Sequence, residues 1–375
     1  MDGRHPQHRP LPGRGDGPSR SSAPAGRGSL LALRCLGLGD FVTAVPALRA
    51  LEREFAHHER LLAAPVVYRD LVRLAGLTWT VLASEPLRTP PWRGPAPDVA
   101  VNLHGRGPQS TAVLRGLAPT RLWSYAPPGE ATTGAPDERA SRSTPPRYTE
   151  APWPGAVHDS RLWCGLLEWN GVRTVPTDML WPRPADHDGE LGARPATAVL
   201  HPGAKTASRR WPPERFALVA RWLREQGLRV VLTGSAEERP LACRVAREAG
   251  LSPQAVVAGR TDLPCLARLV ADAGLLVSGD TGVAHLATVY GTPSVRLFGP
   301  VSPALWGPLI DLDRHECLWT GRTGDPHGDR LDPGLDALGF MEVREACERA
   351  LRRDRISPWH VEVHEPPAGA SGSGE

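Results

Sequence analysis

The sequence predicts an α/β protein with two mostly parallel sheets, one in each half of the chain. Short apolar runs alternate with helical patterns through most of the 375 residues, and this alternation favours parallel strands joined by helices. Glycine and other small residues follow several of the apolar runs in both halves, as expected where an open α/β sheet binds a ligand at its strand ends. The length suits two domains at roughly 150 residues each.

Composition narrows the classes of function. The net charge is +3 and the arginines are scattered, whereas a nucleic-acid-binding protein usually carries a concentrated basic patch. The six cysteines form no C-x-x-C pair, which favours free thiols and a cytoplasmic protein. No apolar run approaches the roughly 20 residues that cross a membrane, so we expect no transmembrane segment, with peripheral membrane contact left open. Residues 1–28 lack the apolar core of a signal peptide and predict a disordered tail.

The first unit consists of a strand over residues 29–36, a glycine-rich turn, and a helix from about Phe41 to Phe55. Pro46 falls early in that helix, where proline is best tolerated. The turn contains only Gly37-x-Gly39, which is weak evidence for a dinucleotide because the third glycine of the full fingerprint is missing. Asp40 ends the turn, and a carboxylate at the carboxyl end of such a strand lies where ligands bind. A plain helix cap is the alternative role for Asp40.

The rest of the first half continues the alternation. We expect strands at 60–65, 81–83, 98–103 and 121–125, and helices at 68–75, 110–117 and 156–170. His104 and Arg106 follow the strand at 98–103, so either a substrate contact or an ordinary loop role fits them. Residues 127–150 are rich in proline and glycine and predict a mobile insertion. The predicted N-terminal domain covers 29–171, and the proline-rich stretch 172–195 predicts the linker.

The second half shows the pattern more cleanly and predicts a C-terminal domain over 196–353, followed by a tail over 354–375. Strands are expected at 196–200, 228–232, 255–258, from 275 and at 294–298, with helices at 213–226, 237–249, 263–273 and 340–352. Three glycines follow these strands, Gly203, Gly234 and Gly279. Because the carboxyl ends of parallel strands share one edge of the sheet, these glycines should line one crevice.

The stretch from Leu275 to Ala287 carries the strongest local signal. An apolar run passes through Ser-Gly-Asp-Thr-Gly into a helical pattern that ends at Gly291. Asp280 or Thr281 can cap this helix, and Gly282 allows a ligand to approach the backbone. The free N–H groups of a helix start suit a phosphate or diphosphate. Thr281 and His285 are four residues apart and share one helix face. An ordinary capped helix start is the alternative.

Taken in order, several motifs together resemble glycosyltransferase family 9, the family of the ADP-heptose:lipopolysaccharide heptosyltransferases. The resemblance covers most of residues 30–307. It rests on Leu33-Arg34, Gly37-x-Gly39-Asp40, Pro46-Ala47-Leu48-Arg49, Asn102-Leu103-His104-Gly105, Arg161, His201-Pro202-Gly203-Ala204, Arg209-Arg210-Trp211-Pro212, Phe216, Thr233-Gly234-Ser235, Ser278 to Ala287 and Phe298-Gly299-Pro300.

The resemblance implies a GT-B architecture, in which two Rossmann-like domains face a central cleft. It implies inverting, metal-independent transfer of a sugar, with Asp40 as the base and no cofactor. A positioned carboxylate suits this role because the acceptor hydroxyl must lose its proton as it attacks. The implied donor side, for a nucleotide-diphosphate sugar such as ADP-heptose, comprises Gly203, Lys205, Arg209, Thr233, Gly234, Asp280, Thr281, Gly282 and His285. The implied acceptor side comprises Gly39, His104 and Arg106, facing a hydroxyl of a glycan or secondary metabolite.

The chain departs from the family pattern at one cationic position. The family often has a lysine before Trp-Pro, whereas this chain has Arg209-Arg210 there and Lys205 earlier in the loop. Arginine keeps the charge but differs from lysine in geometry, so any of the three can meet the diphosphate.

Other functions remain open at this point. A nucleotide-sugar epimerase of similar fold would need an acid/base pair at a sugar carbon, and none stands out in the second half. A non-catalytic nucleotide-sugar-binding module would bind the donor without turnover. An NAD-dependent dehydrogenase fits less well because of the missing third glycine.

Overall fold

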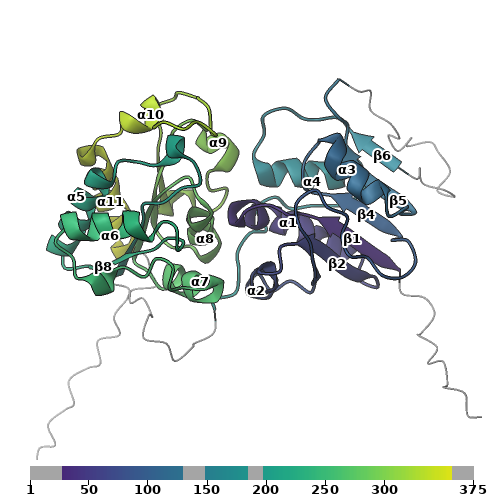
Figure 1. The fold of residues 1–375 in the computed structure, drawn as a ribbon, viewed down its shortest axis with the longest axis horizontal. Helices are drawn as coiled ribbons and strands as arrows, with labels where there is room; N and C mark the ends of the chain where they lie inside the picture. The colour runs from purple at the N-terminus through teal and green to yellow at the C-terminus, as the bar shows by residue number, and fades with distance from the viewer. Residues whose placement is uncertain (1–27, 130–147, 185–196, 357–375) are drawn as a thin grey trace, which may run out of the picture.

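The computed structural model describes residues 28–129, 148–184 and 197–356. The chain forms two α/β bodies that lie side by side (Figure 1). Each body is built on a sheet whose strands are all parallel. The predicted fold class, α/β with two parallel sheets, is confirmed.

The first sheet has the strand order β3-β2-β1-β4-β5-β6. Its strands are β1 (Ser29–Leu33), β2 (Glu59–Ala64), β3 (Thr80–Ala83), β4 (Val99–Asn102), β5 (Arg121–Tyr125) and β6 (Tyr148–Ala151). Its helices are α1 (Leu38–Glu54), α2 (Tyr68–Leu74), α3 (Pro108–Arg115) and α4 (Asp159–Trp169). The order reverses between β1 and β4, and a crevice opens outside the carboxyl ends of strands at such a reversal.

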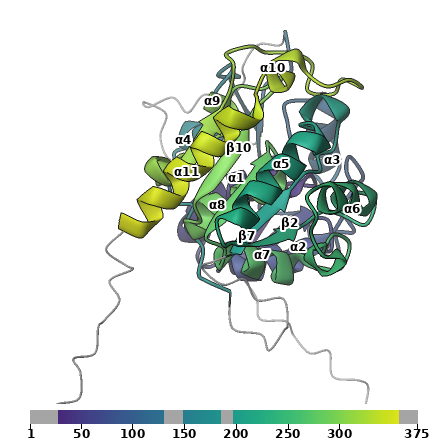
Figure 2. The same cartoon turned by 90° about the vertical axis from the view of Figure 1, so that its left-hand side faces the viewer.

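The second sheet has the order β11-β10-β9-β7-β8. Its strands are β7 (Thr197–His201), β8 (Arg229–Leu232), β9 (Leu275–Gly279), β10 (Ser294–Leu297) and β11 (His315–Leu318). Its helices are α5 (Pro213–Glu225), α6 (Arg239–Glu248), α7 (Leu263–Ala271), α8 (Gly282–Tyr290), α9 (Pro303–Trp306), α10 (Pro333–Asp336) and α11 (Phe340–Ile356). In Figure 2, α5 and α11 lie side by side on one face of this body. The strand order reverses between β7 and β9, the second expected crevice.

Apolar burial explains why these segments form a sheet core. Strands β4, β7, β9 and β10 are buried along their whole length, as parallel strands covered on both faces must be. Helix α8 is buried from Val283 to Tyr290, so it lies in the interior of the molecule. Gly291 ends it in the left-handed conformation, with φ +66°, which glycine adopts without strain.

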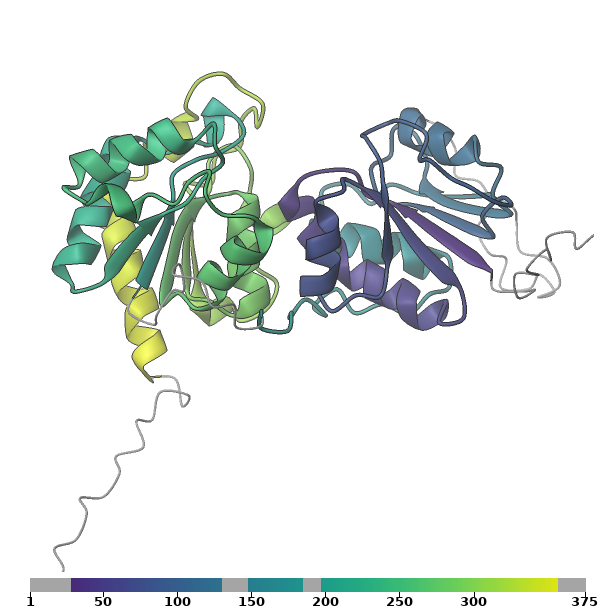
Figure 3. The same ribbon diagram turned by 60° about the horizontal axis from the view of Figure 1, so that its bottom comes forward.

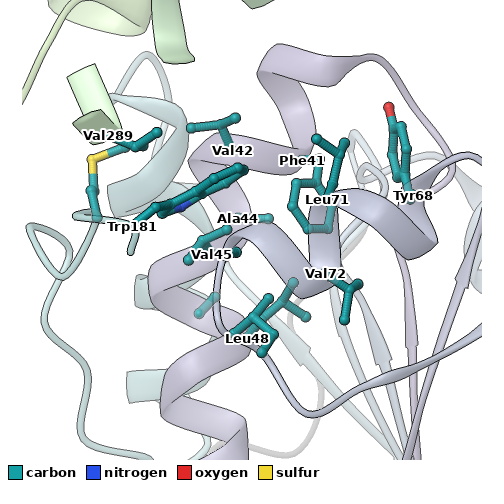
Figure 4. Packing of buried hydrophobic residues seen from close by; sticks show 14 of the residues in the cluster. Phe41, Val42, Ala44, Val45, Leu48, Tyr68, Leu71, Val72, Trp181 and Val289 are labelled. Atoms are coloured by element: carbon teal, nitrogen blue, oxygen red, sulfur yellow. The ribbon is translucent and has the colours of Figure 1, made fainter. Parts of the chain in front are cut away.

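The two bodies are joined by an apolar interface between α1 and α8. Trp181 completes this interface, and Figure 4 shows it among Val42, Val45 and Val289. Its ring stacks edge-on against Phe41 at 6.1 Å and Tyr290 at 5.9 Å between centroids. The backbone N–H of Trp181 also donates to the carbonyl of Val289 at 2.9 Å. A single extended segment, teal in Figure 3, carries the chain from one body towards the other.

Several details of the first half differ from the sequence-based expectations. Helix α1 begins at Leu38 rather than Phe41, so Asp40 lies in its first turn, and the helix continues unbroken past Pro46. The last three residues of the predicted insertion, 148–150, form β6 together with Ala151, and β6 pairs with β5. Residues 130–147 of that insertion lie outside the described residues.

The predicted strand at 255–258 is wrong. Only Val256 bridges to Leu232 there, and Pro253–Ala255 forms a 3-10 turn. The strand β11 and the short helices α9 and α10 were not predicted.

The predicted domain boundaries stay predictions. Residues 1–27, 185–196 and 357–375, which include most of both predicted tails and half of the predicted linker, lie outside the described residues. Among the helices of the described ranges, none combines the length and the apolar character needed to cross a membrane.

Candidate functional site

The two crevices face each other and form one cavity of about 540 Å³ between the bodies. The first body contributes the turn from Gly37 to Asp40, which follows β1. The second body contributes the loops that follow β7 and β9, with additional residues from the segments after β8, β10 and β11. The full lining is Gly37, Leu38, Gly39, Asp40, His201, Ala204, Lys205, Thr206, Arg209, Ser235, Glu238, Asp280, Thr281, Gly282, His285, Trp306, Pro326 and His327.

Two helix N-termini meet at this cavity. Helix α1 starts after Gly37 and helix α8 starts after Thr281. A Cβ on Gly282 would lie 3.2 Å from the backbone nitrogen of Gly39, and a Cβ on Gly39 would lie 2.9 Å from the His285 ring. The turns can approach this closely because both residues are glycine. Unpaired N–H groups and the positive ends of two helix dipoles therefore converge on one place, which favours an anion.

Asp40 lines the cavity, and its carboxylate is also contacted by Gly37 and Arg34 of the first body. One oxygen, Oδ2, accepts from the N–H of Gly37 at 3.0 Å, so Asp40 does cap its helix. The other, Oδ1, lies 3.6 Å from the guanidinium of Arg34. Burial raises the pKa of the Asp40 carboxyl, and Arg34 lowers it by a smaller amount. The carboxylate, with 31% of its side chain exposed, is thus a stronger base than an exposed aspartate.

Three buried polar atoms beside α8 have no hydrogen-bond partner: Arg209 Nε, Asp280 Oδ2 and Thr281 Oγ1. A guanidinium nitrogen of Arg209 lies 3.4 Å from Asp280 Oδ2, an ion pair that orients the arginine at the cavity wall. Thr281 occupies the N-cap position, but its hydroxyl caps nothing. Unsatisfied buried polar groups are rare in folded proteins and need an explanation, and a bound polar ligand would supply their partners.

His285 is neutral at physiological pH. It is fully buried, and burial, followed by the nearby charge of Arg296, lowers its pKa to about 3. Its ring packs edge-on against Trp306 at 6.0 Å between centroids. A neutral imidazole offers one N–H donor and one acceptor, so His285 can donate to a phosphate oxygen without adding a charge.

Some of the predicted donor-side residues line the cavity, and others lie behind the residues that line it. Lys205, Arg209, Asp280, Thr281, Gly282 and His285 line the cavity, whereas Gly203 and Thr233 do not. Thr233 is buried and its hydroxyl bonds the ring of His201 at 3.0 Å. At Gly203 a Cβ would lie 2.2 Å from the Glu238 carboxylate, so this glycine makes room for Glu238. Among the three candidate cations, Arg210 does not line the cavity, and its Nε donates to the carbonyl of Ala204 at 2.8 Å.

A second cavity of about 500 Å³ adjoins the first. Gly234 lines this one, together with Thr261, Leu263 and Leu266. Glu238 and His201 line both cavities. Of the three strand-end glycines, therefore, only Gly234 lines either cavity. At Gly279 a Cβ would lie 3.1 Å from the Arg209 carbonyl.

The acceptor-side residues separate in the structure. Gly39 lines the main cavity, but His104 and Arg106 do not. His104 Nδ1 accepts from the backbone N–H of Cys35 at 3.2 Å, and burial lowers the pKa of its ring. The guanidinium of Arg106 lies over the ring of Trp153 at 4.7 Å. Both residues are thus engaged within the first body, beyond the edge of the cavity.

Sequence reasoning missed several wall residues, notably Glu238, Trp306 and His327. Glu238 follows the Thr233-Gly234-Ser235 motif by three residues, so the motif could have pointed to it. Trp306 and His327 follow β10 and β11, where no local motif marks a strand end. Among the described residues, no group of three or more His, Cys, Asp or Glu side chains lies close enough together to hold a metal ion.

Comparisons with known proteins agree with this geometry. Residues 177–329 match the model of glycosyltransferase family 9 (heptosyltransferase). The lipooligosaccharide heptosyltransferase 2 of Haemophilus influenzae is 36% identical over 167 residues, which cover 42% of this chain and 48% of that protein. The chain spans about half the length of the curated relatives that it matches.

Two solved structures share the whole fold. The structure of E. coli ADP-heptose lps heptosyltransferase II superposes with a TM-score of 0.63 at 20% identity, over 87% of this chain and 99% of that one. The structure of E. coli heptosyltransferase WaaC with ADP gives 0.59 at 16% identity, over 86% and 99%. These likenesses establish the GT-B fold. With the match over residues 177–329, this part of the chain belongs to glycosyltransferase family 9.

Proposed function

We propose that this protein transfers a heptose from ADP-heptose to a hydroxyl group of a glycan or secondary-metabolite acceptor, with inversion at the anomeric carbon and without a metal ion. The observation that carries the proposal is a pair of buried donors without a hydrogen-bond partner, Arg209 Nε and the Thr281 hydroxyl, at the start of α8 in the same cavity as Asp40. The names of the relatives support heptose, and the structure of WaaC with ADP supports the nucleotide.

The diphosphate would bind at the N-terminus of α8. Its oxygens would accept from the backbone N–H groups of Gly282 and Val283, from the Thr281 hydroxyl and from His285. Lys205 and Arg209 would neutralise the charge that grows on the leaving diphosphate. Arg209 can grip two phosphate oxygens at once, whereas Lys205 acts as a point charge. Two cations and a helix N-terminus supply the stabilisation that other transferases obtain from a divalent ion.

The nucleoside would occupy the adjoining cavity. Leu263 and Leu266 give it an apolar wall suited to a purine ring. Glu238 lies where the two cavities join, with Oε2 held by the N–H of Ser235 at 2.8 Å. A carboxylate in that position can accept from the two hydroxyls of a ribose.

Asp40 would act as the base in a single displacement. The acceptor oxygen bonds to the anomeric carbon, its proton moves to Asp40, and the bond from that carbon to the diphosphate oxygen breaks to release ADP. Attack from the side opposite the leaving group inverts the configuration. The raised pKa of Asp40 favours this proton transfer, because base strength increases with pKa.

The acceptor would enter along the first body past Gly39. His104 and Arg106 lie outside the cavity and would meet parts of the acceptor distant from the reacting hydroxyl. We also propose that the protein acts in the cytoplasm, where a nucleotide-sugar donor is available. Peripheral contact with a membrane surface is compatible with this proposal.

A non-catalytic nucleotide-sugar-binding module is the second candidate. This candidate would be favoured if Asp40 were turned away from the cavity. Because Asp40 lines the cavity, the transferase is the better-supported function.

The proposal is tested by incubating the protein with ADP-heptose and a panel of glycan acceptors and measuring ADP release. NMR of the product then reports the anomeric configuration. Asp40→Asn should reduce the transfer rate by about 10² to 10⁴-fold while ADP affinity changes little. An active Asp40→Asn enzyme removes Asp40 as the base, and retention of configuration contradicts a single displacement.

A further inference from the structure

Behind Asp40 lies a buried ion pair between Arg34 and Asp159. Arg34, 1% exposed, extends from the end of β1 towards the start of α4. There its Nη2 donates to Asp159 Oδ2 at 2.6 Å. The Thr43 hydroxyl donates to the same oxygen at 2.5 Å. Asp159 therefore receives two bonds from the first body's central strand and helix, and its own side chain is 10% exposed.

Arg34 also fixes the backbone around Asp40. Its Nε donates to the carbonyl of Asp40 at 2.9 Å, and its Nη1 donates to the carbonyl of Leu103 at 2.6 Å. The ring of Trp163 covers the guanidinium at 4.8 Å. With its three nitrogens engaged in this way, the guanidinium has one fixed position.

In that position the guanidinium of Arg34 lies closer to the carboxylate of Asp159 than to that of Asp40. It contacts Asp159 at 2.6 Å but lies 3.6 Å from Asp40 Oδ1, beyond hydrogen-bond distance. Asp40 is thus oriented through its backbone by Arg34, while its carboxylate is free to face the cavity. A direct bidentate pair with Arg34 would instead turn Asp40 away and occupy the lone pairs that a base needs.

We propose that Arg34 and Asp159 are positioning residues for Asp40, in which Asp159 holds the guanidinium at a distance that keeps the Asp40 carboxylate both oriented and available to take a proton. This inference rests on the proposed function for the role of Asp40 as a base. The charge arrangement itself is independent of that function and can be measured without a substrate.

Other groups also face Asp40, and all remain unchanged in the variants below. Tyr68 of α2 and Asp280 beside α8 interact with it electrostatically. Further ionisable groups around the turn, among the described residues, are Cys35 and His104 from the first body, and Lys205, Arg209, Glu238, His201, His285 and His327 from the second. The differences between variants therefore report on Arg34 and Asp159.

The two partners act on Asp40 in opposite directions. Arg34 lowers the pKa of Asp40, and Asp159 raises it by a smaller amount. Asp159→Asn keeps the shape and the acceptor oxygen but removes the negative charge, so the pKa of Asp40 should fall. Arg34→Gln removes the positive charge, so the pKa of Asp40 should rise. Opposite shifts from two residues in contact are a signature that a merely structural role would not give.

The test is a ¹³C NMR titration of the side-chain carboxyl of Asp40 in the full chain, with its resonance assigned by its loss in Asp40→Asn. The expected result is a lower midpoint in Asp159→Asn and a higher midpoint in Arg34→Gln. Asp178→Asn is the matched control, because Asp178 pairs with Arg49 at 2.6 Å in the same body but does not line the cavity. It should leave the Asp40 midpoint unchanged. An unchanged or raised midpoint in Asp159→Asn overturns the proposal.

Each single variant leaves one buried charge without its partner, which is strongly destabilising. The double variant Arg34→Gln with Asp159→Asn avoids this, and it serves if a single variant does not fold. Because the effect of Arg34 is the larger of the two, the double variant should titrate at a higher pH than the wild type. A midpoint at or below that of the wild type contradicts the proposal.

Activity gives the second readout, with ADP-heptose alone as the probe and water as the acceptor. Asp159→Asn should release ADP about tenfold more slowly, because a positioned base contributes roughly 10² to 10⁴-fold to a rate and this variant should lose only a part of that contribution. The KM for the donor should be unchanged. The acid limb of its pH–rate profile should move to lower pH. If the wild type releases no ADP from ADP-heptose at any pH, with water or with any acceptor of the panel, the proposed function fails, and the NMR titration still decides the positioning role.

Discussion

Replacing Gly282 with alanine adds one methyl group between the two helix N-termini that meet at the cavity. The new Cβ would lie 2.8 Å from Leu38 Cβ, 3.0 Å from Leu38 Cγ and 3.2 Å from the Gly39 nitrogen. Carbon atoms in contact prefer about 3.5 to 4.0 Å, so Leu38 Cβ must retreat by roughly 1 Å. Because that atom is fixed to the backbone of α1, the helix must move with it.

This movement separates α1 from α8 and therefore Asp40 from the donor site. Overpacking of this kind costs about 1 to 3 kcal/mol of stability. A misplacement of about 1 Å between reacting groups can reduce a rate by about 10²-fold. We expect Gly282→Ala to fold with a lower melting temperature, to bind ADP more weakly, and to release ADP from ADP-heptose about 100-fold more slowly.

The assay is chemical denaturation together with the ADP-release measurement, with Gly116→Ala as the control. Gly116 ends α3 at φ −61°, and a Cβ there would meet its nearest atoms at an ordinary 3.5 Å. This control should be neutral or more stable by about 0.4 to 1 kcal/mol, since alanine restricts the unfolded chain. The reasoning is refuted if Gly282→Ala matches the wild type and Gly116→Ala in both stability and rate.

Three further predictions test the site and the fold. Thr281→Ala and His285→Ala should each weaken ADP binding by about tenfold, since a hydrogen bond to a charged group contributes about 1.5 to 3 kcal/mol. Calorimetric titration with ADP measures this, and an unchanged affinity in both variants would mean that the diphosphate binds elsewhere. Burial lowers the pKa of His285 to about 3 and that of His315 to about 2, below the roughly 6.5 of an unfolded histidine, so the unfolded chain binds more protons in acid. The free energy of unfolding should therefore decrease as the pH falls below about 6.5, by about 2 kcal/mol per histidine at pH 5, and His315→Asn should remove its share; an equal slope in that variant would show that His315 does not titrate on unfolding. Trp181→Ala should lower the unfolding free energy by about 3 to 5 kcal/mol, and a loss below 1 kcal/mol in urea denaturation would contradict its place in the core between the bodies.

Local motifs account for what the sequence could predict. The turn ending in Asp40 and the stretch from Ser278 to Gly282 each combine a buried strand, small residues and a helix start. Each of these motifs spans only a few neighbouring residues, so it can be recognised in the sequence without knowledge of the tertiary structure. They were sufficient to predict the fold class, and most of the residues they pointed to line the cavity.

Residues that act through long-range contacts could not be predicted in this way. Asp159 is followed closely by Arg161, the residue of that helix to which the resemblance points, but Arg161 is exposed and Asp159 is buried against Arg34, 125 positions away. Trp306 enters the cavity wall only because a four-residue helix follows β10. The segment around Val256 has a strand-like pattern, yet only Val256 bridges to Leu232 of the edge strand β8, because the residues before it form the 3-10 turn Pro253–Ala255.

The central claim is that the cavity between the two bodies holds an adenosine diphosphate sugar at the start of α8. Thermal unfolding of the purified protein with ADP, ADP-heptose, UDP, GDP, CDP and NAD tests this most directly, because a ligand that binds only the folded state stabilises it by about 2.7 kcal/mol at 100 times its Kd. We predict a rise in melting temperature with ADP and a larger rise with ADP-heptose. A rise with NAD alone, or with none of these ligands, would contradict the claim.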